Sequence, residues 1–345
     1  MSILAGLNLN DMTYKINDNT RCGVIGYGSW ATALVHTLEK NNKEIWWHIR
    51  NEEVLEGLLA EGRNVKYLND LEFNMDLIHP VSDIDEVVRN CEIILVAAPS
   101  AFLKTVMAEL RESLEGKFIL SATKGIIPDE FITITEYFNR TFNVPISNLG
   151  VISGPSHAEE VSRNKLSYLT VACSDVENAR LIGEMFSTSN VKISFSEDVY
   201  GIEYAGILKN IYALAGGLAY GLGYGDNFRA VLTAASAKEM SRFINESHPF
   251  DRDTSDAAYL GDLLVTSYSN FSRNRRMGQL IGKGCSVKSA LNEMTMVAEG
   301  YFAAACIKQV NERYNISIPI ADMVYDVLYK RASPRKKMRE LTQIL

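Results

Sequence analysis

The residue of this sequence best suited to acid–base chemistry is a lysine inside an apolar segment. Lys209, followed by Asn210, interrupts the stretch 202–222, which is rich in apolar residues and has helical spacing. An ammonium group there costs free energy unless it is paired or reaches water, and burial or a cationic neighbour can lower its pKa. Such a lysine can act as a general acid or base. The alternative is a lysine whose side chain snorkels to the surface.

Polar residues also follow two of the predicted strands. Lys124 lies in Ser-Ala-Thr-Lys-Gly at 121–125, and Ser-Gly-Pro-Ser at 153–156 follows the next strand. Open α/β sheets bind ligands beyond the carboxyl ends of their strands, so both segments are candidate ligand contacts. Each segment alone is also compatible with an ordinary turn. Asp262, further along the chain, could orient a lysine or a substrate hydroxyl, or could cap a helix.

A compact run of positive charge, Ser-Arg-Asn-Arg-Arg, stands at 272–276 in a chain whose net charge is −7. An arginine binds phosphate through two parallel hydrogen bonds, and serine and asparagine add neutral ones. The run therefore suits a phosphorylated substrate, although a solvated surface segment can have the same composition. The negative net charge provides no general field that would hold nucleic acid or an acidic membrane.

The clearest cofactor signal is the pattern Gly-x-Gly-x-x-Ala, in which Gly26, Gly28 and Ala31 follow a predicted strand and open a predicted helix. The first glycine permits a tight turn and the second lets the backbone approach a pyrophosphate, which the helix N-terminus also binds. A glycine-rich surface turn is the alternative. Arg50 ends the second strand, where an NAD-specific site often carries an acid, and it suits a 2′-phosphate. NADPH is therefore favoured over NADH, although acidic residues stand nearby at 52–53.

The elements that would position these residues alternate along the first part of the chain. Short aliphatic runs separated by helix-like segments predict a parallel sheet with helices on both faces. After residue 198 the strand-like runs end and helical patterns take over. We therefore predict an α/β plus all-α protein, with an N-terminal extension at 1–20, a Rossmann-type doubly wound domain at 21–198 and a helical domain at 199–345. Strands are expected at 21–25, 44–48, 92–97, 118–122, 150–153, 169–172 and 191–195. Helices are expected at 31–40, 101–114, 200–222, 230–244, 255–267, 287–292, 297–313 and 320–330.

The remaining features of the sequence indicate the cellular compartment in which the protein is expected. The five cysteines are widely spaced without a Cys-x-x-Cys pair, and their odd number argues against a disulfide framework. We therefore expect the cysteines to be buried free thiols in a reducing cytoplasm. The first residues lack the pattern of a secretion signal, and charges within 202–222 argue against membrane insertion. The histidines show no ligand-like spacing, so no metal site is expected.

Together these segments resemble, in order from residue 21 to residue 331, the bacterial NAD(P)-dependent glycerol-3-phosphate dehydrogenases. One motif would be a weak signal, but seven occur in order along the chain. They are GxGSWxTA at 26–33, ATKG at 122–125, VISGPSxAxE at 151–160, LKN at 208–210, GDLLVT at 261–266, SRNRRMG at 272–278 and VAEGY at 297–301. The resemblance implies reversible reduction of dihydroxyacetone phosphate to sn-glycerol 3-phosphate by NADH or NADPH, which supplies glycerophospholipid synthesis.

The site residues of this family carry over onto matching positions. The resemblance makes Lys209 the proton donor and acceptor at the substrate C2 oxygen, with Lys124 touching substrate and cofactor. In the mechanism that we expect, Asp262 would hold the Lys209 ammonium in place. Around glycerol 3-phosphate it places Gly154, Ser156, Lys124, Lys209, Asp262, Ser272, Arg273 and Asn274. Around NADH or NADPH it places Gly26, Gly28, Ser29, Trp30, Arg50, Lys124, Ala158, Arg273, Val297 and Glu299.

Three departures from the family pattern bear on specificity. Ala31 replaces a glycine, His157 stands where a bulky or aromatic residue is common, and the extension 1–20 is an addition. Two other functions stay open: a dehydrogenase for another small phosphorylated hydroxy compound, and a non-catalytic dinucleotide sensor. The sensor would predict loss of Lys209, Lys124 or Asp262, all of which are present. The oligomeric state is also open, with a homodimer as one option.

Overall fold

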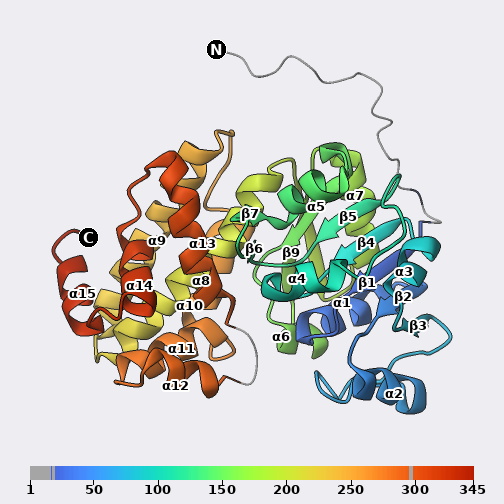
Figure 1. Ribbon diagram of the computed structural model, residues 1–345, viewed down its shortest axis with the longest axis horizontal. Coiled ribbons are helices and arrows are strands. Elements are labelled where there is room, and N and C mark those ends of the chain that lie inside the picture. Colours follow the sequence, from blue (N-terminus) through green and yellow to red (C-terminus); the bar gives the residue numbers. More distant parts are fainter. Residues whose placement is uncertain (1–16, 18–19, 295–297) are drawn as a thin grey trace.

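The computed structural model describes residues 17, 20–294 and 298–345, so most of the predicted extension at 1–20 lies outside the described residues. Two parts lie side by side along the longest axis of the molecule (Figure 1). One is a sheet flanked by helices, built from the first half of the chain, and the other is a bundle of helices built from the second half. The predicted α/β plus all-α architecture is confirmed.

Among the described residues, the first part contains a sheet of eight strands in the order β10-β9-β8-β5-β4-β1-β2-β3. Side chains alternate along the strands: in β4, Ile93 and Leu95 join the core on one face, and Ile94 and Val96 join the core on the other. Burial on both faces explains the nearly continuous apolar runs of the sequence. The strands are β1 (Cys22–Ile25), β2 (Ile45–His48), β3 (Ile78–Val81), β4 (Ile93–Val96), β5 (Phe118–Ser121), β8 (Leu149–Ser153), β9 (Ser167–Cys173) and β10 (Val191–Ser196).

The sheet is not parallel throughout, which corrects the sequence prediction. β8 and β9 pair antiparallel, with Ser153 opposite Thr170, and β10 follows the direction of β9. The connection between them contains a helix of only five residues, α6 (Ala158–Ser162). Because β8 and β9 are antiparallel, β9 starts at the edge of the sheet where β8 ends.

Two pieces of extended structure escaped the sequence analysis. The edge strand β3 contains His79 and Pro80, and a proline lowers the strand signal even though sheet edges tolerate it. The hairpin of β6 (Ile126–Ile127) and β7 (Ile132–Thr133) has only two residues in each strand. Both strands of this hairpin are too short for periodicity to reveal them.

The helices of the first part cover the sheet, and several begin with a side-chain cap that accepts a backbone N–H, as at Asn51, Asp83, Thr133 and Asp175. Five of them, α2, α3, α5, α6 and α7, were not among the predicted helices. The predicted helix at 101–114 ends early, at Met107. The helices are α1 (Ser29–Lys40), α2 (Glu52–Glu61), α3 (Ile84–Asn90), α4 (Ser100–Met107), α5 (Ile134–Phe142), α6, α7 (Val176–Phe186) and the short 3₁₀ helix η1 (Ile146–Asn148).

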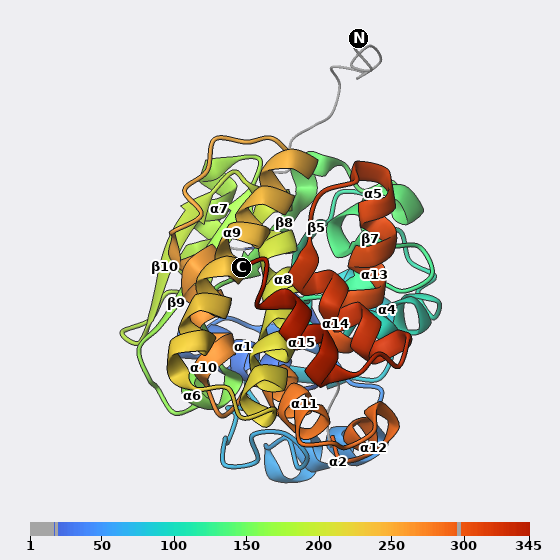
Figure 2. The same cartoon turned by 90° about the vertical axis from the view of Figure 1, so that its left-hand side faces the viewer.

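The second part is arranged around α8 (Val199–Gly221), which is buried along most of its length. Helices α9, α10, α11, α13 and α14 pack on it from the bundle, and β8 and β9 from the sheet (Figure 2). A helix that is apolar all round is expected at such a central place. The other elements are α9 (Asp226–Ser247), the π-helix η2 (Ala257–Gly261), α10 (Asp262–Tyr268), α11 (Arg273–Gly282), α12 (Val287–Asn292), α13 (Glu299–Tyr314), α14 (Pro319–Tyr329) and α15 (Pro334–Leu341).

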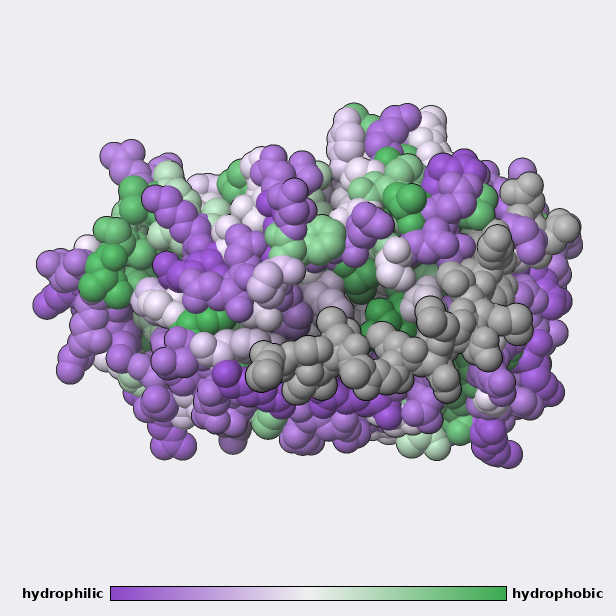
Figure 3. Space-filling view, turned by 90° about the horizontal axis from the view of Figure 1, so that it is seen from above, coloured by the Kyte–Doolittle hydropathy of each residue, from purple (hydrophilic) through white to green (hydrophobic). Residues whose placement is uncertain are grey.

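The surface carries hydrophilic side chains over most of the face seen from above, with smaller hydrophobic patches between them (Figure 3). Within the described ranges, no helix has the length and apolar character needed to cross a membrane. All five cysteines are free thiols, of which four are buried and Cys285 is half-buried.

Candidate active site

Three charged side chains singled out in the sequence meet between the two parts of the molecule. The Lys209 ammonium donates to Oδ1 of Asp262, and Lys124 Nζ donates to Oδ2 of the same carboxylate at 2.9 Å. Lys124 Nζ also donates to the carbonyl oxygen of Gly154 at 3.0 Å. One carboxylate thus bridges two ammonium groups, and the cluster has an excess positive charge when all three groups are ionised.

Each of the three side chains is carried by a different element of the fold. Lys124 follows the carboxyl end of β5, Lys209 lies near the middle of α8, and Asp262 is the first residue of α10, which packs on α8. Only 6% of Lys209 and 1% of Asp262 are exposed. Bulk water therefore solvates neither of these two charged groups. The alternative, in which the Lys209 side chain snorkels to the surface, is wrong.

The electrostatics of the cluster prepare Lys209 for proton transfer. Burial lowers the pKa of Lys209 to about 7, and the Lys124 ammonium acts in the same direction, while the Asp262 carboxylate opposes the shift. Burial alone would raise the pKa of Asp262, yet the two ammonium groups hold it below its usual value. Lys209 can therefore gain and lose a proton near neutral pH beside a carboxylate that stays ionised.

A chain of side-chain amides fixes the backbone around the two lysines. Asn210 Nδ2 donates to the carbonyl oxygen of Lys124 at 3.1 Å, and Asn210 Oδ1 accepts from Nδ2 of Asn274 at 2.8 Å. Asn274 Oδ1 accepts in turn from the N–H of Gly300 at 2.9 Å, in the first turn of α13. Because both asparagines are buried, these bonds hold the loop after β5 and helices α8, α11 and α13 in one arrangement.

Helix α11 reaches the cluster because it crosses α8 at backbone contact. A Cβ atom on Gly217 would lie 2.1 Å from the carbonyl oxygen of Arg275, and one on Gly278 would lie 2.2 Å from that of Leu214. Any side chain at either position would push the helices apart. The close crossing brings the first turn of α11, which the basic run at 272–276 forms, against Asn210 on α8.

The other predicted substrate contacts stand around this cluster. Gly154 has a φ of +129°, which favours glycine, and its carbonyl oxygen accepts from Ser156 Oγ at 3.0 Å as well as from Lys124. Ser272 is buried as the N-cap of α11, and Arg273 beside it is exposed. No hydrogen bond or ion pair joins the Arg273 guanidinium to another described residue, so its donors are available to an anion.

The turn between β1 and α1 fits a dinucleotide. Gly26 has a φ of +122°, and a Cβ atom there would lie 2.7 Å from the backbone of residues 97–98. Gly28 is the N-cap of α1, which has no side-chain cap, and nothing lies within 4 Å of the Cβ position of Gly28. This combination leaves the helix N-terminus open to a phosphate. Trp30 follows, with its ring centre 5.9 Å from Lys124 Nζ.

The remaining predicted cofactor residues are spread over several elements. Glu299, at the start of α13, accepts from the N–H of Ser100 at 3.1 Å and from its hydroxyl at 2.7 Å, and burial raises the pKa of Glu299. Arg50 is exposed beyond β2, where its Nη2 lies 2.8 Å from Oε1 of Glu109. The others are Ser29, the first residue of α1, and Ala158, the first residue of α6, while Val297 lies outside the described residues.

The structure adds residues to which the sequence analysis assigned no role. Asn210 could have been flagged, because an amide beside Lys209 in an apolar helix needs partners. Ser100 and His157 gave no such signal, since their contacts depend on tertiary structure. His157 Nε2 is buried with no hydrogen-bond partner among the described residues, and burial followed by the charge of Lys209 lowers the pKa of His157.

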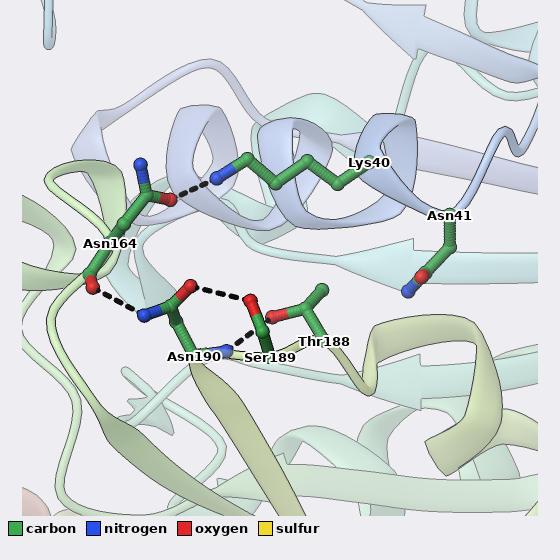
Figure 4. A pocket seen from close by; sticks show the side chains of 6 residues that line it. All are labelled: Lys40, Asn41, Asn164, Thr188, Ser189 and Asn190. Carbon is green, nitrogen blue, oxygen red and sulfur yellow. Dashed lines mark hydrogen bonds between the residues drawn. The ribbon is translucent and has the colours of Figure 1, made fainter.

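A polar hollow of about 430 Å³ lies elsewhere, lined by Lys40, Asn41, Asn164, Thr188, Ser189 and Asn190 (Figure 4). Its polar groups bond to one another: Lys40 donates to Asn164 Oδ1, and Asn190 Nδ2 donates to the carbonyl oxygen of Asn164 at 2.7 Å. The hollow contains none of the predicted site residues. The cluster around Lys209 is therefore the better candidate for chemistry.

Known proteins match the chain along nearly its whole length. The family model described as the NAD-dependent glycerol-3-phosphate dehydrogenase N-terminus matches residues 21–179, and that of the C-terminus matches 198–339. A glycerol-3-phosphate dehydrogenase (NAD(P)+) of Clostridium botulinum (strain Eklund 17B / Type B) is 33% identical over 323 residues, covering 93% of this chain and 97% of its own. One of Chlorobium limicola is 33% identical, covering 89% and 92%. The crystal structure of glycerol-3-phosphate dehydrogenase from Coxiella burnetii superimposes with a TM-score of 0.86 at 27% identity, covering 94% of this chain and 98% of its own.

Proposed function

The chain belongs to the NAD-dependent glycerol-3-phosphate dehydrogenase family, and on that premise we propose that it reduces dihydroxyacetone phosphate to sn-glycerol 3-phosphate with NADH or NADPH. It is an NAD(P)-dependent oxidoreductase, and the usual role of such enzymes is to supply glycerophospholipid synthesis. The reaction is reversible. The bound reduced nicotinamide supplies the hydride, and the residues of this chain manage the proton and the phosphate.

We propose Lys209 as the acid that donates a proton to the substrate carbonyl oxygen as the carbonyl carbon is reduced. The observation that carries this role is the Asp262 carboxylate shared between two buried ammonium groups. It holds the Lys209 ammonium in a fixed position, while burial, together with the Lys124 ammonium, keeps the pKa of Lys209 near neutrality. Lys124 donates to the same carboxylate and would stabilise negative charge that develops on the substrate oxygen. In the reverse direction, neutral Lys209 would accept the hydroxyl proton of glycerol 3-phosphate.

The substrate phosphate would bind at the start of α11. Arg273 offers a guanidinium that makes no hydrogen bond or ion pair with another described residue, in the same helical turn as the buried amide of Asn274. Ser272, Gly154 and Ser156 would complete the substrate site. A guanidinium at this place favours a phosphorylated substrate over a neutral one.

The cofactor would lie over the turn at Gly26 and Gly28, with Trp30, Ala158 and Glu299 beside it. Val297, which lies outside the described residues, remains a cofactor contact predicted by the resemblance alone. Arg50 supports a preference for NADPH, because its guanidinium lies beyond the carboxyl end of β2, where the adenosine ribose binds in this type of fold. Its pairing with Glu109 is exposed and can be exchanged for a 2′-phosphate.

Three broader statements belong to the same proposal. We place the domain boundary at residue 198, supported by the start of α8 at Val199. A cytoplasmic location is supported by five free thiols, and no interaction with nucleic acid or membrane insertion is proposed. A homodimer is compatible with the mechanism but is not required by it, since Lys209, Lys124 and Asp262 all come from one chain.

The test is to follow the oxidation of NADH and of NADPH with dihydroxyacetone phosphate, with unphosphorylated dihydroxyacetone as the control, and to identify the product. The proposal predicts rapid oxidation with the phosphate alone, formation of sn-glycerol 3-phosphate, and a higher kcat/KM with NADPH. Equal rates with dihydroxyacetone would refute the phosphate site. Tight NADPH binding without oxidation by this substrate would instead favour another phosphorylated carbonyl compound or a dinucleotide sensor.

A further inference from the structure

Asp198 is a buried carboxylate outside the active-site cluster, and it joins two elements that build that cluster. It is the N-cap of α8, where its Oδ1 accepts from the N–H of Gly201 at 3.0 Å. Arg252 donates to it from Nε at 2.5 Å and from Nη2 at 3.0 Å, and the Tyr259 hydroxyl donates to its Oδ2 at 2.5 Å. Only 4% of Asp198 is exposed. Such a carboxylate fastens its partners firmly because water does not compete for them.

Arg252 extends this network to the loop that precedes η2. Its Nη2 also donates to the carbonyl oxygen of His248 at 2.7 Å, and its Nη1 donates to Oδ1 of Asn245 at 2.6 Å. The loop 248–256 is therefore tied both to the end of α9 and to the start of α8. The element that leaves this loop is η2, which carries Tyr259.

Tyr259 lies in the middle of the π-helix η2, which runs directly into Asp262. The N–H of Gly261 donates to the carbonyl oxygen of Asp256 at 3.4 Å, a bond that reaches five residues back instead of four. Each residue of an α-helix turns the chain by about 100°, so the extra residue changes the direction of every side chain that follows. The π-turn therefore decides whether Asp262 points toward Lys209.

We propose that Tyr259 and Asp198 are positioning residues for the acid–base pair of Lys209 and Asp262, and this inference rests on the role proposed above for that pair. Asp198 and Lys209 are about three turns, or about 16 Å, apart along α8. The segment of η2 and α10 is tied to α8 at both places, once through the Tyr259 hydroxyl and once through Asp262. Two hydrogen-bonded ties constrain its rotation and its position along α8 more tightly than one would.

The consequence concerns the charge balance around Lys209. The titratable groups that face it are Asp262 on α10, Lys124 in the loop after β5, and His157 in the loop before α6. Of these, only the carboxylate stabilises the ammonium form. If the π-turn loosens, Asp262 stays close to Lys209 for less of the time, and Lys209 then loses its proton at a lower pH.

The test is the variant Tyr259→Phe, which removes the hydroxyl and keeps the ring, in the full-length protein. The matched control is Tyr329→Phe in α14, where the lost hydroxyl bonds to the carbonyl oxygen of Tyr301 at 2.7 Å, outside the active site. Isotopically labelled lysine allows Lys209 to be titrated by NMR, with its resonance identified by its absence in Lys209→Met. Thermal unfolding and the kinetics of dihydroxyacetone phosphate reduction are measured on the same preparations.

For Tyr259→Phe we expect the Lys209 titration to move down by about half a pH unit or more. We also expect kcat to fall by about tenfold with KM nearly unchanged. Tyr329→Phe should lower the unfolding temperature to a similar degree while leaving both quantities at their wild-type values. The second variant, Asp198→Asn, keeps an oxygen for the N–H of Gly201 and should shift the titration in the same direction.

If Tyr259→Phe lowers only the unfolding temperature, and the Lys209 titration and kcat keep their wild-type values, the proposal is overturned. The network would then have a purely structural role. An equal shift in Tyr329→Phe would overturn it as well. The Lys209 titration does not depend on turnover. If the wild-type protein fails to reduce dihydroxyacetone phosphate, the proposed function fails, while the titration still decides whether Tyr259 positions the pair.

Discussion

Replacing Asp262 with asparagine removes the charge that holds Lys209 in its ammonium form and changes the size of the side chain very little. A carboxylate and an ammonium about 3 Å apart attract each other by about 5 kcal/mol at an effective dielectric constant of about 20. One pKa unit corresponds to about 1.4 kcal/mol, so the pKa of Lys209 should fall by as much as about 4 units, and by at least about 2 after relaxation. Starting from about 7, a fall of 2 units leaves about 1% of Lys209 protonated at pH 7, compared with about half in the wild-type protein.

Reduction of dihydroxyacetone phosphate by Asp262→Asn at pH 7 should therefore be at least about 50-fold slower, because it requires the protonated lysine. The rate is followed by the absorbance of reduced nicotinamide, and NADPH binding by fluorescence titration should change little. The matched control is Asp322→Asn, which breaks the ion pair with Lys308, 2.7 Å away on the surface of the same domain, and should leave the rate unchanged. A wild-type rate in Asp262→Asn at pH 7, in folded protein, would refute the reasoning about the bridging carboxylate.

Two further predictions concern the binding sites. Gly26→Ala should destabilise the protein by about 1–3 kcal/mol and weaken NADPH binding, because its φ of +122° is strained for alanine and the new Cβ would lie 2.7 Å from backbone. Gly28→Ala, which has open space around the Cβ position, should weaken binding without loss of stability, and equal unfolding temperatures for the two variants would contradict this account. Arg273→Ala should raise KM for dihydroxyacetone phosphate by about 10- to 100-fold through the loss of charge-assisted hydrogen bonds. An unchanged KM in steady-state kinetics would exclude Arg273 from the phosphate site.

Much of the candidate site could be predicted from the sequence, because residues with strict structural requirements are easy to recognise in it. A lysine within an apolar helix can be buried only if its charge finds a partner. The glycine pattern at 26–31 is informative because it directly follows the first strand. The pairing of Lys124 with Asp262 is different, since 138 residues separate the two in the chain. Residue types suggested that both are functional. Only the packing of α10 and the loop after β5 against α8 shows that Lys124 shares the Asp262 carboxylate with Lys209.

The fold could be predicted from sequence only where an element is long and periodic. Elements whose course depends on a local contact or a single residue were not predicted. The reversal at β9 comes after the short helix α6, and no hydrophobic pattern in the sequence predicts it. The π-turn at 257–261 looks like ordinary helix in the sequence, because the extra residue in the turn is set by contacts such as that of Tyr259 with Asp198. Edge strand β3 was hidden by its proline.

The most direct test of the account is the pH dependence of kcat in both directions on one preparation. Reduction of dihydroxyacetone phosphate needs protonated Lys209, so its rate should be constant at low pH and fall as the pH rises through about 7. Oxidation of glycerol 3-phosphate needs neutral Lys209, so its rate should rise through the same pKa, and Lys209→Met should lose both activities. Rates that change in the same sense with pH in both directions, or substantial turnover in Lys209→Met, would contradict the assignment of Lys209 as the proton donor and acceptor.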